Sequence, residues 1–134
     1  MSTRSITILM DGDTEIAVLY RHCDGYPTGQ GADLLRILAG KKCVNGISGK
    51  GPQINGAGDM AAQVVAGLKG DSGGNFYLYP PGTRDVWEEY TYTVTYVGPG
   101  EAIRLVVDGH RGRLYDGPIG DFDPEKAEEV EHDD

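Results

Sequence analysis

The sequence predicts an α+β fold: a small antiparallel sheet with two helices on one face. Three features indicate it. Apolar residues alternate with polar ones near both ends of the chain, two central segments have helical spacing, and turn residues separate these segments. Strands segregated from central helices favour α+β over repeated βαβ units. The expected order is ββααβββ, with room for one more strand near the end.

The first half predicts a hairpin followed by two helices. Residues 6–10 and 16–20 alternate, and Asp11-Gly12-Asp13 between them is a hairpin turn signal. Residues 32–39 predict a helix that ends at Gly40. After a glycine-rich, irregular connection over 43–58, Asp59 is the expected cap of a slim, alanine-rich helix that runs to about Lys69.

The second half predicts a meander of neighbouring strands over residues 75–79, 87–97 and 102–108, with a short one near 113–115. Its strands carry most of the eight tyrosines, at Tyr77, Tyr79, Tyr90, Tyr92 and Tyr96. On adjacent strands these rings make a stacking surface for a base. The alternatives are a half-exposed face with cross-strand aromatic pairs, or a subunit interface.

Composition and charge narrow the classes of partner. Of the net charge of -9, residues 121–134 contribute -7, through eight acids and one lysine. We therefore expect one ligand-binding domain over residues 1–120 and a flexible acidic tail over 121–134, with a frayed helix over residues 124–131 as the alternative for part of the tail. The chain has no long basic stripe for duplex nucleic acid and no apolar run near the ~20 residues of a membrane span. Two cysteines and no signal-peptide pattern favour a cytoplasmic location.

The segment from residue 19 to residue 31 is the richest in chemical groups. Arg21, His22, Asp24 and Tyr26 exceed what a turn requires, and the Gly29-x-Gly31 step leads into a helix, where backbone N–H groups can hold an anion. Two interpretations stay open: one wall of a small-molecule site, or a capped strand–turn–helix joint.

A second candidate binding residue is Arg84, which follows the stiff Pro80-Pro81-Gly82 turn. Its guanidinium matches a phosphate bidentately, or it pairs with Asp85 or Glu88 on the surface. His22, Cys23 and Asp24 are contiguous and would alternate in direction on a strand, so we expect no metal site, no cofactor and no catalytic residue.

Several motifs together resemble small proteins of phages and prophages. They are Tyr20-Arg21-His22-x-Asp24-Gly25-Tyr26-Pro27-x-Gly29-x-Gly31, Val44-Asn45-Gly46-Ile47, Asn55-Gly56-x-Gly58, and the run from Tyr77 to Asp85. Size and element order resemble the anti-Thoeris sponge proteins, which phages use against TIR-based defence. The resemblance implies a non-enzymatic homo-oligomer in the host cytoplasm that sequesters cyclic ADP-ribose-type signals, and in some members cyclic oligonucleotides, without cleaving them.

For such a ligand we expect the two arginines, Arg21 and Arg84, to pair with phosphates. A base would stack on Tyr79, Tyr90 or Tyr92, and hydroxyls or an amine would donate to Asp24, Asn55 or Glu89. His22 and Tyr26 complete the predicted ligand-binding set.

Two other classes of function remain as alternatives. One is a phage structural or interaction module without a small ligand, and the other is a small phosphodiesterase or cysteine-dependent hydrolase that uses His22 or Cys23. Whatever the function, we expect a small sheet with two short helices to leave one face uncovered, which favours at least a dimer. In the sponge class, tyrosine or arginine residues near the ligand would come from both chains.

Overall fold

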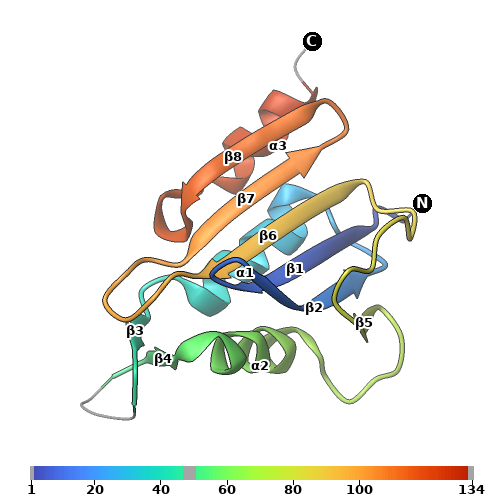
Figure 1. Ribbon diagram of the computed structural model, residues 1–134. Helices are drawn as coiled ribbons and strands as arrows, with labels where there is room; N and C mark the ends of the chain where they lie inside the picture. The colour runs from blue at the N-terminus through green and yellow to red at the C-terminus, as the bar shows by residue number, and fades with distance from the viewer. Residues whose placement is uncertain (1, 47–50, 133–134) are drawn as a thin grey trace.

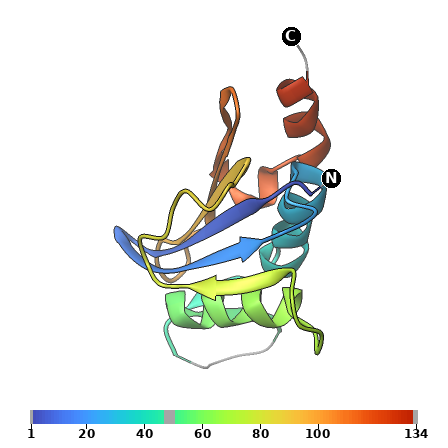
Figure 2. The ribbon, with the colours of Figure 1, turned by 90° about the vertical axis from the view of Figure 1, so that its right-hand side faces the viewer.

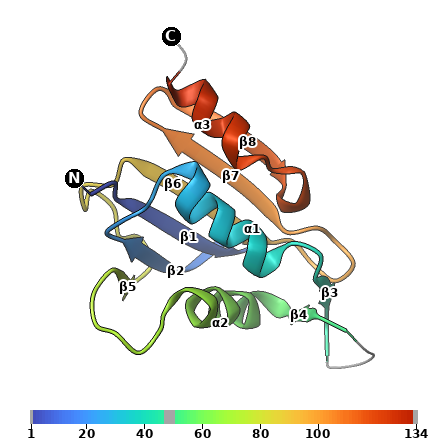
Figure 3. The same ribbon diagram turned by 180° about the vertical axis from the view of Figure 1, so that it is seen from behind.

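The computed structural model describes residues 2–46 and 51–132. In this part of the chain a six-stranded sheet carries three helices on one face, which confirms the α+β class (Figures 1 and 3). From one edge to the other, the sheet consists of β5 (Phe76–Tyr79), β2 (Thr14–Arg21), β1 (Ser5–Asp11), β6 (Tyr90–Tyr96), β7 (Arg104–Gly109) and β8 (Gly112–Pro118).

The sheet is antiparallel except at its centre, where β1 and β6 pair in parallel. The expected meander is confirmed for β6, β7 and β8, which are antiparallel neighbours. It is wrong for β5, because β2 and β1 lie between β5 and β6. Residues 80–89 connect β5 to β6 across the face opposite the helices (Figure 2), where Val86 packs against the cluster of Ile6, Ile8 and Val18.

The three helices cover the other face of the sheet (Figure 3). A π-helical turn, η1 (Pro27–Gly31), leads into α1 (Ala32–Leu38), and α2 (Gly56–Leu68) packs beside it. Their apolar faces bury Leu34, Met60 and Val64 against Tyr92 and other residues of the sheet. None of these helices, nor α3 (Pro124–His132), is long and apolar enough to cross a membrane within the described residues.

The connection between α1 and α2 has more structure than the glycine content predicts. Strands β3 (Lys42–Val44) and β4 (Gln53–Asn55) form a small parallel sheet. Helix α2 begins at Gly56 rather than at Asp59. Asp59 still stabilises the start of the helix, because its Oδ2 accepts the backbone N–H of Asn55 at 2.8 Å.

A packed helix replaces the flexible tail expected after residue 120. After a short 3-10 turn, η2 (Ile119–Asp121), helix α3 packs against η1 and β8. Phe122 and Ala127 are buried in the main core. The acidic composition of this segment does not indicate these contacts. So short a helix is stabilised by tertiary packing rather than by helical propensity. Residues 133–134 of the expected tail lie outside the described part.

We predict that Tyr92→Phe destabilises the fold, whereas Tyr77→Phe does not. Tyr92 is fully buried, and its hydroxyl donates to Gly25 O at 2.7 Å. Its loss leaves a carbonyl without that donor and should cost about 1–2 kcal/mol. Tyr77 is exposed, so the same deletion should change the free energy of unfolding little. Urea denaturation measures both, and equal effects would contradict the prediction.

Candidate functional site

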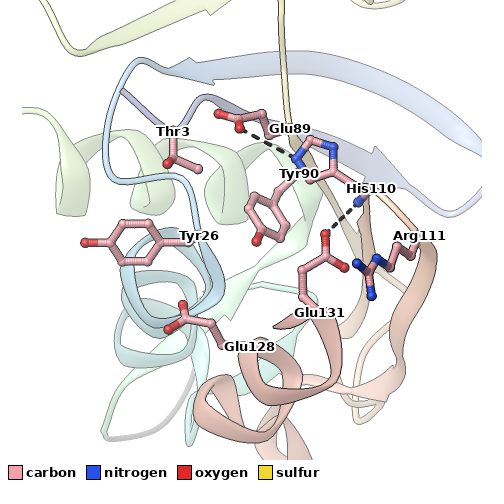
Figure 4. A pocket seen from close by; sticks show the side chains of 8 residues that line it. All are labelled: Thr3, Tyr26, Glu89, Tyr90, His110, Arg111, Glu128 and Glu131. Atoms are coloured by element: carbon pink, nitrogen blue, oxygen red, sulfur yellow. Dashed lines mark hydrogen bonds and ion pairs between the residues drawn. The ribbon is translucent and has the colours of Figure 1, made fainter. Parts of the chain in front are cut away.

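A pocket of about 460 Å³ lies where five segments meet (Figure 4). These segments are the chain just before β1, the start of β6, the turn between β7 and β8, helix α3, and the chain just before η1. The side chains that line it are Thr3, Tyr26, Glu89, Tyr90, His110, Arg111, Glu128 and Glu131. The pocket is therefore built from parts of the chain that are far apart in the sequence, with α3 as one wall.

Each of the three glutamates in the lining is held by a hydrogen bond from the backbone of another segment. Glu89 Oε2 accepts from Arg4 N at 3.2 Å, and Glu131 Oε1 accepts from His110 N at 2.8 Å. Glu128 Oε1 accepts from both the N–H and the hydroxyl of Thr28, at 3.2 and 2.9 Å. The carboxylates thus join the pocket walls. The other oxygen of Glu89 lies 3.5 Å from His110 Nε2, whereas Glu131 keeps one oxygen without a hydrogen-bond partner among the described residues.

The most deeply buried of these carboxylates is that of Glu131, whose residue is only 6% exposed. Its Oε2 has no hydrogen-bond partner among the residues that the structure describes. The adjacent Gly109 permits this arrangement, because a Cβ at that position would lie 2.8 Å from the carboxylate oxygens. An unpartnered buried carboxylate oxygen is costly, so a donor from a ligand would stabilise this site.

Tyr90 forms the floor between the acidic side chains. Burial, and then the charges of Glu131, Glu128 and Glu89, raise the pKa of Tyr90 to about 12. The phenol therefore stays neutral at physiological pH and can donate a hydrogen bond. Its ring meets the His110 imidazole edge-on at 6.1 Å, and His110 Nε2 lies 3.5 Å from Glu89 Oε1.

The charges in the lining favour ligands with hydrogen-bond donors or positive charge over anionic ligands. Three carboxylates face one guanidinium, that of Arg111, and one imidazole, that of His110. Arg111 is exposed at the rim side of the β7–β8 turn. A ligand with hydroxyl, amino or cationic groups is therefore complementary to the inner wall, whereas a phosphate is complementary only to the side that carries Arg111.

Of the ten residues predicted to bind ligand, three line this pocket: Tyr26, Glu89 and Tyr90. Burial, and next the Asp24 carboxylate, raise the pKa of Tyr26. The sequence analysis missed Thr3, His110, Arg111, Glu128 and Glu131. Two signals were available: Glu128 and Glu131 share one helix face at i, i+3, and His110-Arg111 places two basic side chains in a hairpin turn.

The side chain of Arg21 makes structural contacts and does not line the pocket. Its Nη1 donates to Gln30 Oε1 at 2.9 Å and Asp33 Oδ2 at 2.7 Å, and its Nε donates to Cys23 O at 3.0 Å. The guanidinium also lies over the Phe76 ring, with Cζ 4.9 Å from the ring centroid. This side chain fastens the end of β2 to α1, which agrees with the joint interpretation of the segment.

The glycines of the same segment serve close packing. The N–H of Gly29 donates to Tyr26 O, and that of Gln30 to Asp24 O and Tyr26 O, so these donors are used inside the turn. A Cβ on Gly31 would lie 2.9 Å from the Phe122 ring. The geometry therefore does not present the expected anion cradle.

His22 and Asp24 lie outside the pocket lining. His22 Nε2 is 2.9 Å from Ser2 Oγ, and its Nδ1 is 3.3 Å from the Tyr20 hydroxyl. Asp24 is exposed. The polar run of the motif thus divides between the two faces of the sheet.

The predicted stacking surface of tyrosines does not form, because its members lie on opposite faces of the sheet. Tyr79 stacks on Tyr77 at 6.4 Å and contacts Tyr20 on the face away from the helices. Tyr90 and Tyr92 face the helices, and Tyr92 is fully buried. The strand registers cause this separation, because Tyr79 pairs with Val18 on the face away from the helices, whereas Tyr92 pairs with Thr7 on the helix-covered face.

Arg84 and Asn55 are also remote from the pocket. Arg84 Nη2 donates to Glu15 Oε1 at 2.7 Å, and this hydrogen bond raises the pKa of Arg84 and lowers that of Glu15. Asn55 Oδ1 accepts from Gly46 N at 2.8 Å beside the small sheet. Ile47, which belongs to the same motif as Gly46, lies outside the described residues.

Comparisons with known proteins assign neither a family nor a function to this chain. No protein-family model, curated protein or solved structure matches the chain. Among the described residues, no three His, Cys, Asp or Glu side chains are arranged to hold a metal ion.

We predict that Arg21→Ala and Arg84→Ala differ sharply in stability. Removal of the buried Arg21 leaves Gln30 and Asp33 without their donor and should cost roughly 2–4 kcal/mol. Arg84 is more than a third exposed, so loss of its ion pair should cost less than about 1 kcal/mol. Thermal and urea unfolding test this difference, and a stable Arg21→Ala protein would contradict it.

Proposed function

We propose that this chain is a binding protein that captures a small nucleotide-derived signal in the Tyr26–Tyr90–Glu131 pocket and releases it unchanged. The observation that supports it is the convergence of three glutamates and two tyrosines on one pocket of about 460 Å³. That volume is within the range of small-molecule sites. The few polar groups are held in place by backbone hydrogen bonds, as in sites formed before the ligand arrives.

A nucleoside has the groups that this lining complements. Ribose hydroxyls and an exocyclic amine donate hydrogen bonds, which the second oxygens of Glu128 and Glu131 can accept. The half-buried Tyr26 offers an aromatic surface beside them, and base–aromatic stacking contributes about 1–3 kcal/mol per base.

The phosphate contacts that we propose differ from those expected from the sequence. Arg21 and Arg84 lie outside the pocket lining, where they pair with Asp33 and Glu15. Arg111, in the turn between β7 and β8, is the arginine that lines the pocket. Because carboxylates outnumber cations there, the proposal favours a ligand with few phosphates, placed toward Arg111 and solvent.

Capture without cleavage is part of the proposal. A sponge must bind the ground state of its ligand tightly and release it slowly, and needs no group that acts only in a transition state. With the resemblance to phage proteins, the proposed setting is the host-cell cytoplasm, where cyclic ADP-ribose isomers or cyclic oligonucleotides would be withheld from their receptor.

The test is calorimetry against cyclic ADP-ribose isomers and cyclic di- and trinucleotides, followed by heat denaturation and chromatography of the released ligand. We expect one class to bind and to return intact. Tyr26→Ala should weaken binding about tenfold or more, whereas Tyr79→Ala on the opposite face should not. If no compound of the panel binds, the proposal is refuted, and a chemically altered ligand would indicate an enzyme. If only Tyr79→Ala weakens binding, the site lies on the opposite face of the sheet.

A second candidate function, a protein-interaction module, is favoured by exposed apolar side chains outside the pocket. Trp87 is 82% exposed on the crossover loop, and Leu78 is 59% exposed on the edge strand β5. Large aromatic residues of this kind are enriched at interfaces.

We propose that β5 is the contact between two copies of the chain. It is an edge strand, so beyond it no described strand completes the backbone hydrogen bonds, and it carries the exposed Tyr77 and Leu78. Sedimentation velocity at micromolar concentration should show a dimer. Leu78→Lys should shift it to monomer, while Val130→Lys, an equally exposed position on α3, should not. A monomeric wild-type chain would overturn this contact.

A further inference from the structure

We propose that the unpartnered oxygen of Glu131 is the docking point for a positively charged nitrogen, so that the pocket selects a ligand with an ammonium, amidinium or guanidinium group. This inference deepens the proposed function and shares its pocket. It does not require the ligand to be a nucleotide.

The position of Glu131 is the first support. The residue is 6% exposed, one of its oxygens is held by His110 N at 2.8 Å, and the other has no partner in the described part of the chain. Figure 4 shows the side chain directed from α3 toward Tyr90 and the β7–β8 turn. A carboxylate oriented in this way, with one free oxygen in a pocket, is a charge-assisted acceptor.

The surrounding charge is the second support. Glu89 and Glu128 line the same pocket, so three carboxylates face one guanidinium and one imidazole. The acidic excess remains even when His110 is protonated. A neutral hydroxyl would satisfy the free oxygen, but only a cation also offsets the repulsion among the carboxylates.

The aromatic lining is the third support. Tyr90 and Tyr26 belong to the same pocket, and a cation over an aromatic face gains further attraction. Carboxylates combined with tyrosine rings fit an organic cation better than a bare metal ion. In agreement, no metal-binding cluster occurs among the described residues.

The experiment compares probes of similar shape and different charge. Benzylamine and benzamidine are cationic at neutral pH, and benzyl alcohol is neutral. In heteronuclear NMR titrations of the full chain, we expect the two cations to shift the amides of His110, Glu131 and Tyr90. The alcohol should do so at least about tenfold more weakly.

The variants separate charge at Glu131 from general acidity. Glu131→Gln keeps an acceptor for His110 N but removes the charge, and should weaken cation binding about tenfold or more. Glu129→Gln makes the same change at an exposed position of α3 and should have no effect. Gly109→Ala is a second variant, which crowds the Glu131 carboxylate without altering charge and should also weaken binding.

Equal binding of benzyl alcohol and benzylamine, or equal affinities of Glu131→Gln and Glu129→Gln, would overturn the cation site. Its failure is distinguishable from failure of the proposed function. If amines bind through Glu131 while the nucleotide panel is silent, the cation site stands and the nucleotide proposal falls. If a nucleotide binds and Glu131→Gln leaves its affinity unchanged, the reverse holds.

Discussion

The buried guanidinium of Arg21 is the interaction on which the arrangement of the first half of the chain depends. A buried cation needs polar partners, and Arg21 Nε and Nη1 find them in Cys23 O, Gln30 and Asp33. Gln30 in turn donates to the Thr7 hydroxyl at 2.8 Å. These bonds fix the segment between β2 and α1 against the centre of the sheet, and so determine where Tyr26 stands at the pocket.

The second half of the chain completes the pocket by a similar use of charge. Three glutamates each bind backbone N–H groups of another segment: Glu89 at the start of β1, Glu128 at η1, and Glu131 at the β7–β8 turn. Glu128 and Glu131 use one oxygen each for these bonds, whereas the second oxygen of Glu89 lies 3.5 Å from His110 Nε2. The same side chains therefore hold the walls together and present acceptors to a ligand, which links the stability of α3 to the proposed binding.

The residues with the most conspicuous chemistry in the sequence are largely structural. Arg21 and the glycines of its segment pack the joint between strand and helix, as the plainer interpretation of that segment holds. Of the binding residues that we propose, Tyr26, Glu89 and Tyr90 were predicted from the sequence, and the others come mainly from the acidic tail and a hairpin turn. Polar side chains in a tail have no local pattern that reveals burial, because Phe122 and Ala127 provide the contacts that fold α3 onto the body.

The sequence by itself determined the α+β class, the approximate position of most strands, and helices α1 and α2. Apolar periodicity is a local property, and each of these follows from it. Only the tertiary structure decided that β6 pairs in parallel with β1, that Tyr79 and Tyr90 lie on opposite faces, and that Glu131 meets His110. These are pairings between distant segments, which the crossover over residues 80–89 and the docking of α3 establish, and no local pattern encodes them.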